Sequence, residues 1–230
     1  MLKTLLMAGL LYSAAIASAS AQSGIALAGM EVSRDDQYAY LGTVIPLPGQ
    51  RIGNGFVQRY WIDYIAYRYE QSALQDIDAK VVGGEAALGF QKAESGSWWG
   101  AYLGARYANT RLSPDDPGND DRGARWRAKL QIEGETQLAG NWRINGILSH
   151  QIGNDDYWAR VRLQTTLTNK WHVGPEFVAQ GDSNYSAQKL GAYIGNIWLG
   201  GSALTLKAGV NNPEDFSPSM YAGAEFYIPF

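Results

Sequence analysis

Charged side chains and one glutamine occupy alternate positions between residues 125 and 135, and the positions between them are mostly apolar. A period of two predicts a strand with one polar and one apolar face. The same alternation in other segments predicts that basic and acidic groups gather on one surface. Side chains of these types contact ions, hydroxyl groups or one another. The candidate site residues are Arg59, Asp63, Glu85, Arg106, Arg125, Arg127, Lys129, Glu133, Arg160, Arg162, Glu176, Lys207 and Glu225.

Two interpretations of this charged surface are open. Charges of both signs are costly in a dry interior unless they pair, so these groups could form ion pairs that fill the interior and fix strand register. Alternatively, they line a narrow, water-filled passage with an excess of basic groups, where tyrosine rings and charges contact a hydroxyl-rich glycan or an ion. Strand register decides between the two.

One histidine offers the chemistry of a hydrolase, in which His takes the proton of an attacking Ser hydroxyl. Ser149 and His150 are adjacent in sequence, so on a strand they point to opposite faces and cannot pair directly. A serine from another strand, such as Ser183 or Ser186, would have to lie beside His150. We therefore expect no catalytic residue and no enzyme activity.

An acidic segment near residue 118 offers oxygen ligands for a hard cation such as calcium. It lacks the ligand order of an EF-hand and a terminal bidentate Glu, so we expect a solvated loop, no metal site and no cofactor. The chain has no cysteine, which excludes disulfides and thiolate metal sites. Its net charge of -3 predicts no attraction to nucleic acid.

The elements that position the charged groups are strands, and we predict about twelve in a single all-β domain. The final segment, from Met220 to Phe230, has apolar residues at every even position and ends on an aromatic residue. That pattern is typical of the closing strand of a transmembrane barrel, with one face toward lipid. The expected strands lie near residues 25–33, 38–46, 56–69, 77–91, 97–110, 122–137, 141–151, 156–167, 170–180, 186–198, 203–211 and 219–230.

The two ends of the chain predict its location. Lys3, an apolar run and the segment Ala19-Ser20-Ala21 have the pattern of a cleaved signal peptide, which predicts a leader at residues 1–21 and a barrel at 22–230. Phe230 resembles the terminal signal that the outer-membrane assembly machinery binds. We expect a single antiparallel barrel in the outer membrane of a Gram-negative bacterium, in contact with its lipid.

Connections between the predicted strands fall into two classes. Odd connections are rich in Asp and Glu, whereas even ones after the first, such as Gly200-Gly201-Ser202, are short and nearly uncharged. Outer-membrane barrels have long outer loops and short periplasmic turns. With an even number of strands, this pattern predicts that both termini are periplasmic.

Four segments resemble the family of small exported proteins described as cellulose biosynthesis protein BcsS. They read GMEVSRDDQYAYLGTVIPLPG, YLGARYANTRLSPDDP, GPEFVAQGDSNY and EFYIPF. The resemblance implies an outer-membrane barrel for exopolysaccharide, especially cellulose, biosynthesis or export, with polysaccharide and cellulose-secretion components as partners and no catalytic residues. A structural or porin-like small-solute barrel is the alternative, and an outer-membrane lipid hydrolase is the third. Pro229 departs from the usual barrel ending because it donates no ladder hydrogen bond.

Overall fold

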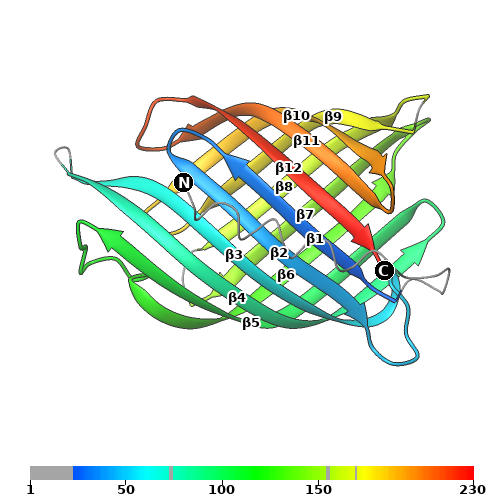
Figure 1. The fold of residues 1–230 in the computed structure, drawn as a ribbon, viewed down its shortest axis with the longest axis horizontal. Helices are drawn as coiled ribbons and strands as arrows, with labels where there is room; N and C mark the ends of the chain where they lie inside the picture. The colour runs from blue at the N-terminus through cyan, green and yellow to red at the C-terminus, as the bar shows by residue number, and fades with distance from the viewer. Residues whose placement is uncertain (1–22, 73–74, 154–155, 169) are drawn as a thin grey trace.

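The computed structural model describes residues 23–72, 75–153, 156–168 and 170–230, so the predicted leader at 1–21 lies outside the described residues. Twelve antiparallel strands form one closed barrel, in which each strand pairs with its sequence neighbours and β1 pairs with β12 (Figure 1). The strands are β1 (Ile25–Val32), β2 (Asp36–Pro46), β3 (Asn54–Ser72), β4 (Gln75–Glu94), β5 (Ser97–Ser113), β6 (Gly123–Gln137), β7 (Trp142–Ile152), β8 (Tyr157–Thr166), β9 (His172–Gly181), β10 (Ser186–Leu199), β11 (Ser202–Pro213) and β12 (Ser219–Pro229).

The predicted strand number and fold class are confirmed. The strands β3, β4 and β5 extend beyond their predicted ends because ladder pairing continues there, with Glu70 opposite Asp76 and Asp78 opposite Ser113. Inside the same end of the barrel, Tyr67, Tyr69, Ile77 and Ala79 form a buried cluster with Tyr185. The predicted inner face held charged, polar and tyrosine side chains, so the aliphatic Ile77 and Ala79 are a difference.

The first and last strands close the barrel. Residue Ile25 lies opposite Pro229, and the register continues to Val32 opposite Ala222. Beyond the proline, the Phe230 amide donates to the Gly24 carbonyl at 3.0 Å, and the Gly24 amide donates back at 2.9 Å. Pairing therefore resumes after Pro229, and the absent proline donor does not open the seam.

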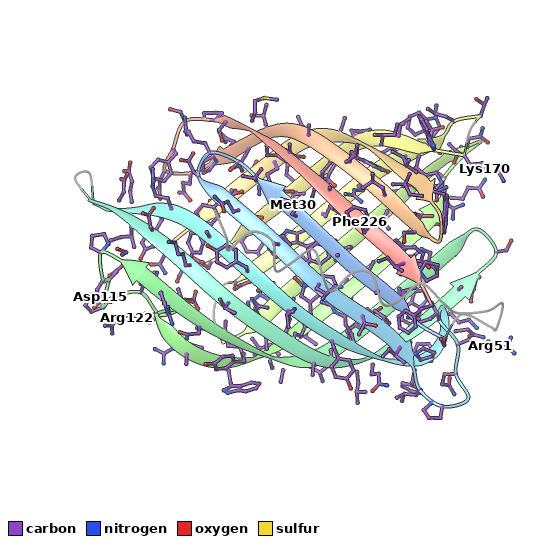
Figure 2. All side chains as sticks on the ribbon, in the orientation of Figure 1. Met30, Arg51, Asp115, Arg122, Lys170 and Phe226 are labelled. Carbon is purple, nitrogen blue, oxygen red and sulfur yellow. The ribbon has the colours of Figure 1, made fainter. Side chains whose placement is uncertain are left out.

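The outer surface carries the apolar face. Exposed large apolar side chains such as Met30, Ile62, Leu88 and Phe226 point away from the lumen, and Figure 2 shows Met30 and Phe226 on β1 and β12. No helix among the described residues is long and apolar enough to cross a membrane. An apolar outer face with charged groups inside inverts the arrangement of a soluble barrel.

The two ends of the barrel differ. At one end, residues 114–122 connect β5 to β6, and we call this the loop end. The opposite end carries short connections such as Gly200–Gly201, and we call it the turn end. Figure 2 shows Asp115 and Arg122 at the loop end and Arg51 with Lys170 at the turn end.

Candidate functional site

One half of the inner wall carries a compact group of ion pairs on β3 to β6. Arg106 makes two bonds to Asp63, at 2.5 and 2.8 Å. Glu85 accepts Arg59 at 3.1 Å and Lys129 at 2.9 Å. We call these five residues the β3–β6 network. Because carboxylates and basic groups pair within the wall, the cost of burying their charges is offset.

The other half carries a second group, which we call the β8–β2 network. Its Lys207 lies 2.6 Å from Glu31 and 3.2 Å from Glu225, and its Arg162 lies 2.5 Å from Glu176. Among the described residues, no ion pair joins this network to the β3–β6 network. The network consists of Glu31, Asp36, Arg160, Arg162, Glu176, Lys189, Lys207 and Glu225.

A cavity of about 460 Å³ lies between these walls. Its lining extends from Ile25 and Tyr227 near the turn end to Asp121 and Asp182 at the loop end. The space persists because each wall satisfies its own charges instead of bridging the lumen. The structure thus contains part of each sequence interpretation: ion-paired networks in the wall and an open space in the lumen.

Two aromatic rings on the cavity wall stack face to face. Tyr40 and Trp61 stack with ring centroids 4.6 Å apart and planes 15° from parallel. A Cβ atom added to Gly29 would overlap the Tyr40 ring, and one added to Gly42 would overlap Trp61. Each ring thus covers a glycine on the neighbouring strand. Larger residues at these two glycines would push the rings into the lumen.

The structure places most candidate residues around this space. Three members, Glu85, Arg162 and Glu176, are buried in the networks and do not line the cavity. Arg125 is exposed and donates to the Asp120 carbonyl at 3.2 Å, which places it at the loop end outside the cavity. Contact of these side chains with a glycan or ion stays a prediction. The candidates that line the cavity are Arg59, Asp63, Arg106, Arg127, Lys129, Glu133, Arg160, Lys207 and Glu225.

Sequence reasoning missed several lumen groups. Lys189 bonds to Glu31 at 2.5 Å and to Asp36 at 3.1 Å, across strands far apart in sequence. Among the described lining residues, seven side chains are basic and eight are carboxylic acids. The expected excess of basic groups is therefore not seen in this cavity.

Carboxylic acids gather where the cavity reaches the loop end. Burial, together with nearby Asp182 and Asp121, raises the pKa of Asp156 from 3.8 to about 6, against the opposing effects of Arg106 and Lys129. Burial also raises the pKa of Asp182. Tyr67 donates to the Asp182 carboxylate at 3.3 Å. This end of the cavity therefore changes charge in mildly acidic conditions.

The histidine considered for hydrolysis lies on the outer surface, whereas Ser149 is buried on the inner side. On successive neighbouring strands, His150 lies opposite Tyr157, Tyr157 opposite Gly181, and Gly181 opposite Ser186. Three strand spacings put Ser186 about 15 Å away. Its hydroxyl instead donates to Glu214 at 2.7 Å. This geometry provides no Ser-His pair at His150.

The acidic loop uses its oxygen atoms internally. The Tyr69 hydroxyl donates to Asp116 at 2.8 Å, and the Asn119 side-chain amide donates to that hydroxyl at 2.9 Å. Arg122 pairs with Asp115 at 2.6 Å. In the part of the chain that the structure describes, no group of three or more His, Cys, Asp or Glu side chains is arranged to hold a metal ion.

Solved structures with the same architecture are membrane proteins. An outer membrane channel from Pseudomonas putida F1 has a TM-score of 0.56 at 11% identity, covering 93% of this chain and 97% of that one. LpxR from Salmonella typhimurium has a TM-score of 0.53 at 9% identity, covering 90% of this chain and 100% of that one. A KdgM porin has a TM-score of 0.50 at 11% identity, covering 90% of this chain and 99% of that one. With the apolar outer face, this likeness identifies the chain as an outer-membrane β-barrel.

The family follows from sequence. The profile of the family described as cellulose biosynthesis protein BcsS matches residues 25–230. No curated protein sequence matches the chain. The chain therefore belongs to the BcsS family, which confirms the resemblance and associates it with cellulose biosynthesis.

Proposed function

We propose that this protein is a non-catalytic outer-membrane barrel that binds a cellulose chain in its lumen during export. The observation that carries the proposal is the elongated cavity with the stacked Tyr40–Trp61 pair on its wall. Aromatic faces pack against the apolar faces of sugar rings, while surrounding polar groups bond their hydroxyls. Family membership supports cellulose as the glycan.

Unsatisfied donors support the same proposal. The buried Nε atoms of Arg59 and Arg160 have no hydrogen-bond partner, and both residues line the cavity. A buried donor without a partner costs about 1–3 kcal/mol. A small shift of either side chain toward a glycan hydroxyl would supply the missing acceptor, and the two arginines lie on opposite walls of the cavity.

The test uses titration calorimetry to measure how soluble cello-oligosaccharides bind to the purified barrel in detergent. We expect saturable binding to the wild type and at least about tenfold weaker binding to the Y40A/W61A variant, because the aromatic surface of the stacked pair is lost, and a tenfold change corresponds to about 1.4 kcal/mol. In cells, the same variant should reduce surface cellulose.

A matched control is Y60A/W99A, which removes the same residue types from the lipid-facing surface. It should bind the oligosaccharide as the wild type does. Absence of binding to the wild type would refute the proposal, as would equal binding by both double variants.

A porin-like barrel for small solutes is the second candidate, favoured by the same cavity. It predicts conductance in planar bilayers that cello-oligosaccharides do not block. The third, a lipid hydrolase, lacks support from the site because Ser149 faces the lumen and Ser186 lies three strands from His150 and bonds to Glu214. A role without catalysis is thus part of our proposal.

Further parts of the proposal concern location and partners. Both termini face the periplasm, so that the acidic loop end faces outward, in agreement with the strand number and connection lengths. Cellulose-secretion components are the proposed partners, since a lumen-bound chain must be delivered from the periplasmic side. Phe230 is the proposed contact for the assembly machinery, and residues 1–21 are the proposed leader.

A further inference from the structure

Two basic side chains face each other on the outer surface near the loop end. Lys80 on β4 and Arg111 on β5 are directly opposed in the strand register, and both are exposed. Directly opposed side chains lie about 5 Å apart at Cβ, and like charges there are destabilising. Neither makes an ion pair with a described residue. The pair therefore favours an anion between the two groups.

The nearest acidic groups on these strands are already engaged. Asp78, two positions from Lys80, accepts Arg68 at 3.1 Å. Asp115, beyond the end of β5, accepts Arg122 at 2.6 and 2.7 Å, and Figure 2 shows this pair at the loop end. The protein's own carboxylates thus leave Lys80 and Arg111 without a counter-charge.

The depth of the pair matches a membrane boundary. On the outward face of β4, apolar or small residues run from Val82 to Phe90, with Lys80 and Lys92 beyond the two ends. With a rise of about 3.3 Å per residue and a tilt of about 40°, the segment from Lys80 to Phe90 spans about 25 Å along the barrel axis. That is about the height of the apolar band of outer-membrane barrels. Lys80 and Arg111 therefore lie at the level of lipid headgroups.

Aromatic side chains lie on the membrane side of the basic pair. Tyr107, four residues before Arg111 on the same face, packs against Trp126 with ring centroids 5.2 Å apart. Trp126 is 72% exposed on the outer surface. With the same rise and tilt, Tyr107 lies about 10 Å deeper than Arg111, at the level of acyl chains. The acyl chains of a lipid bound at the basic pair would thus pass along an aromatic surface.

We propose that Lys80 and Arg111 bind the phosphate of a phosphorylated glycolipid in the outer leaflet. The guanidinium and ammonium groups donate charge-assisted hydrogen bonds to the phosphate oxygens. The sugar lies at the level of the basic pair, and the acyl chains lie against Trp126 and along the apolar face of β4 and β5. This lipid site is separate from the lumen and does not depend on glycan binding there.

The experiment measures lipid retained by the folded barrel, using native mass spectrometry in detergent with lipid A as the probe. We expect bisphosphorylated lipid A to bind at least about tenfold more tightly than dephosphorylated lipid A, because hydrogen bonds to a charged group are worth about 1.5–3 kcal/mol each. The K80Q/R111Q variant should lose this preference. Inorganic phosphate should not displace the lipid, since the acyl contacts remain.

The matched control is R51Q/K92Q, which removes one Arg and one Lys near the turn end and should keep the preference. Folding of each variant is checked by heat-modifiable mobility. A charge-retaining K80R/R111K variant should bind as the wild type does. If K80Q/R111Q does not fold, the single variants K80Q and R111Q replace it, and each should weaken the preference. Equal binding of the two lipids by the wild type would overturn the site. So would an equal loss in the control, or displacement by inorganic phosphate, which would identify a site for free anions.

Discussion

Arg106 and Asp63 carry the clearest energetic consequence of a single ion pair. Both side chains are buried, and two hydrogen bonds join them. Removing one partner of a buried pair leaves the other charge uncompensated, whereas removing both does not. Removing one partner should therefore cost more stability than the intact ion pair contributes.

We predict that R106L lowers the free energy of unfolding by about 3–5 kcal/mol, because Asp63 remains charged and buried. The double variant D63L/R106L should lose less than R106L alone. The measurement is urea unfolding of the barrel in lipid vesicles.

The control for this prediction is R68L, which breaks the exposed Arg68–Asp78 pair. An exposed pair contributes about 0–1 kcal/mol, so the loss should be small. A similar loss in R106L and R68L would contradict the role of burial.

At the scale of elements, the connections at the loop end govern the response to pH. Asp156 immediately precedes β8, and Asp182 immediately follows β9. Burial raises the pKa of both carboxyls above the usual range for Asp. A group with a raised folded-state pKa binds its proton more tightly in the folded protein. Stability is then greatest with the group protonated and falls as pH rises.

We predict that the free energy of unfolding of the wild type falls as pH rises from about 4 to about 6, the interval between the two pKa values of Asp156. The D156N variant should show a flatter profile over this interval, because it has no proton to lose. D182N should flatten the profile in the same direction. An unchanged slope in D156N would show that other groups control this pH dependence.

At the scale of the whole molecule, alternation was sufficient to predict the barrel but not the contents of its lumen. In β6 the charged and apolar faces are unambiguous, so the sequence alone predicts which side chains face the lumen. In β1, however, Ile25 and Leu27 point inward while Ala26 and Ala28 point outward. Both faces are apolar, so the inward position of Glu31 was not evident.

Partners across the lumen depend on closure. Glu31 on β1 and Lys189 on β10 meet at 2.5 Å, although 158 residues separate them. Alternation gives the face of each residue but not its height relative to a strand three places around the barrel. The twelve strands and most lumen residues were therefore predictable, whereas the two networks and the cavity between them required the register of the closed sheet.

Register and connection lengths together lead to the last prediction, which concerns orientation. The chain has no cysteine, so a single introduced thiol reports its own side of the membrane. Asp116 is buried and bonds to Tyr69, which makes it a poor labelling position, whereas Asp120 in the same loop is exposed. Ala139, in the turn between β6 and β7, is exposed at the opposite end.

We predict that an impermeant thiol reagent labels D120C on intact cells and does not label A139C until the outer membrane is permeabilised. The physical reason is that long acidic loops remain solvated outside, while short turns face the periplasm. Labelling is measured as the modified fraction on gels, with the cysteine-free wild type as background. The reverse pattern would place the loop end in the periplasm, and it would also move Lys80 and Arg111 to the inner leaflet, away from the glycolipid proposed to bind them.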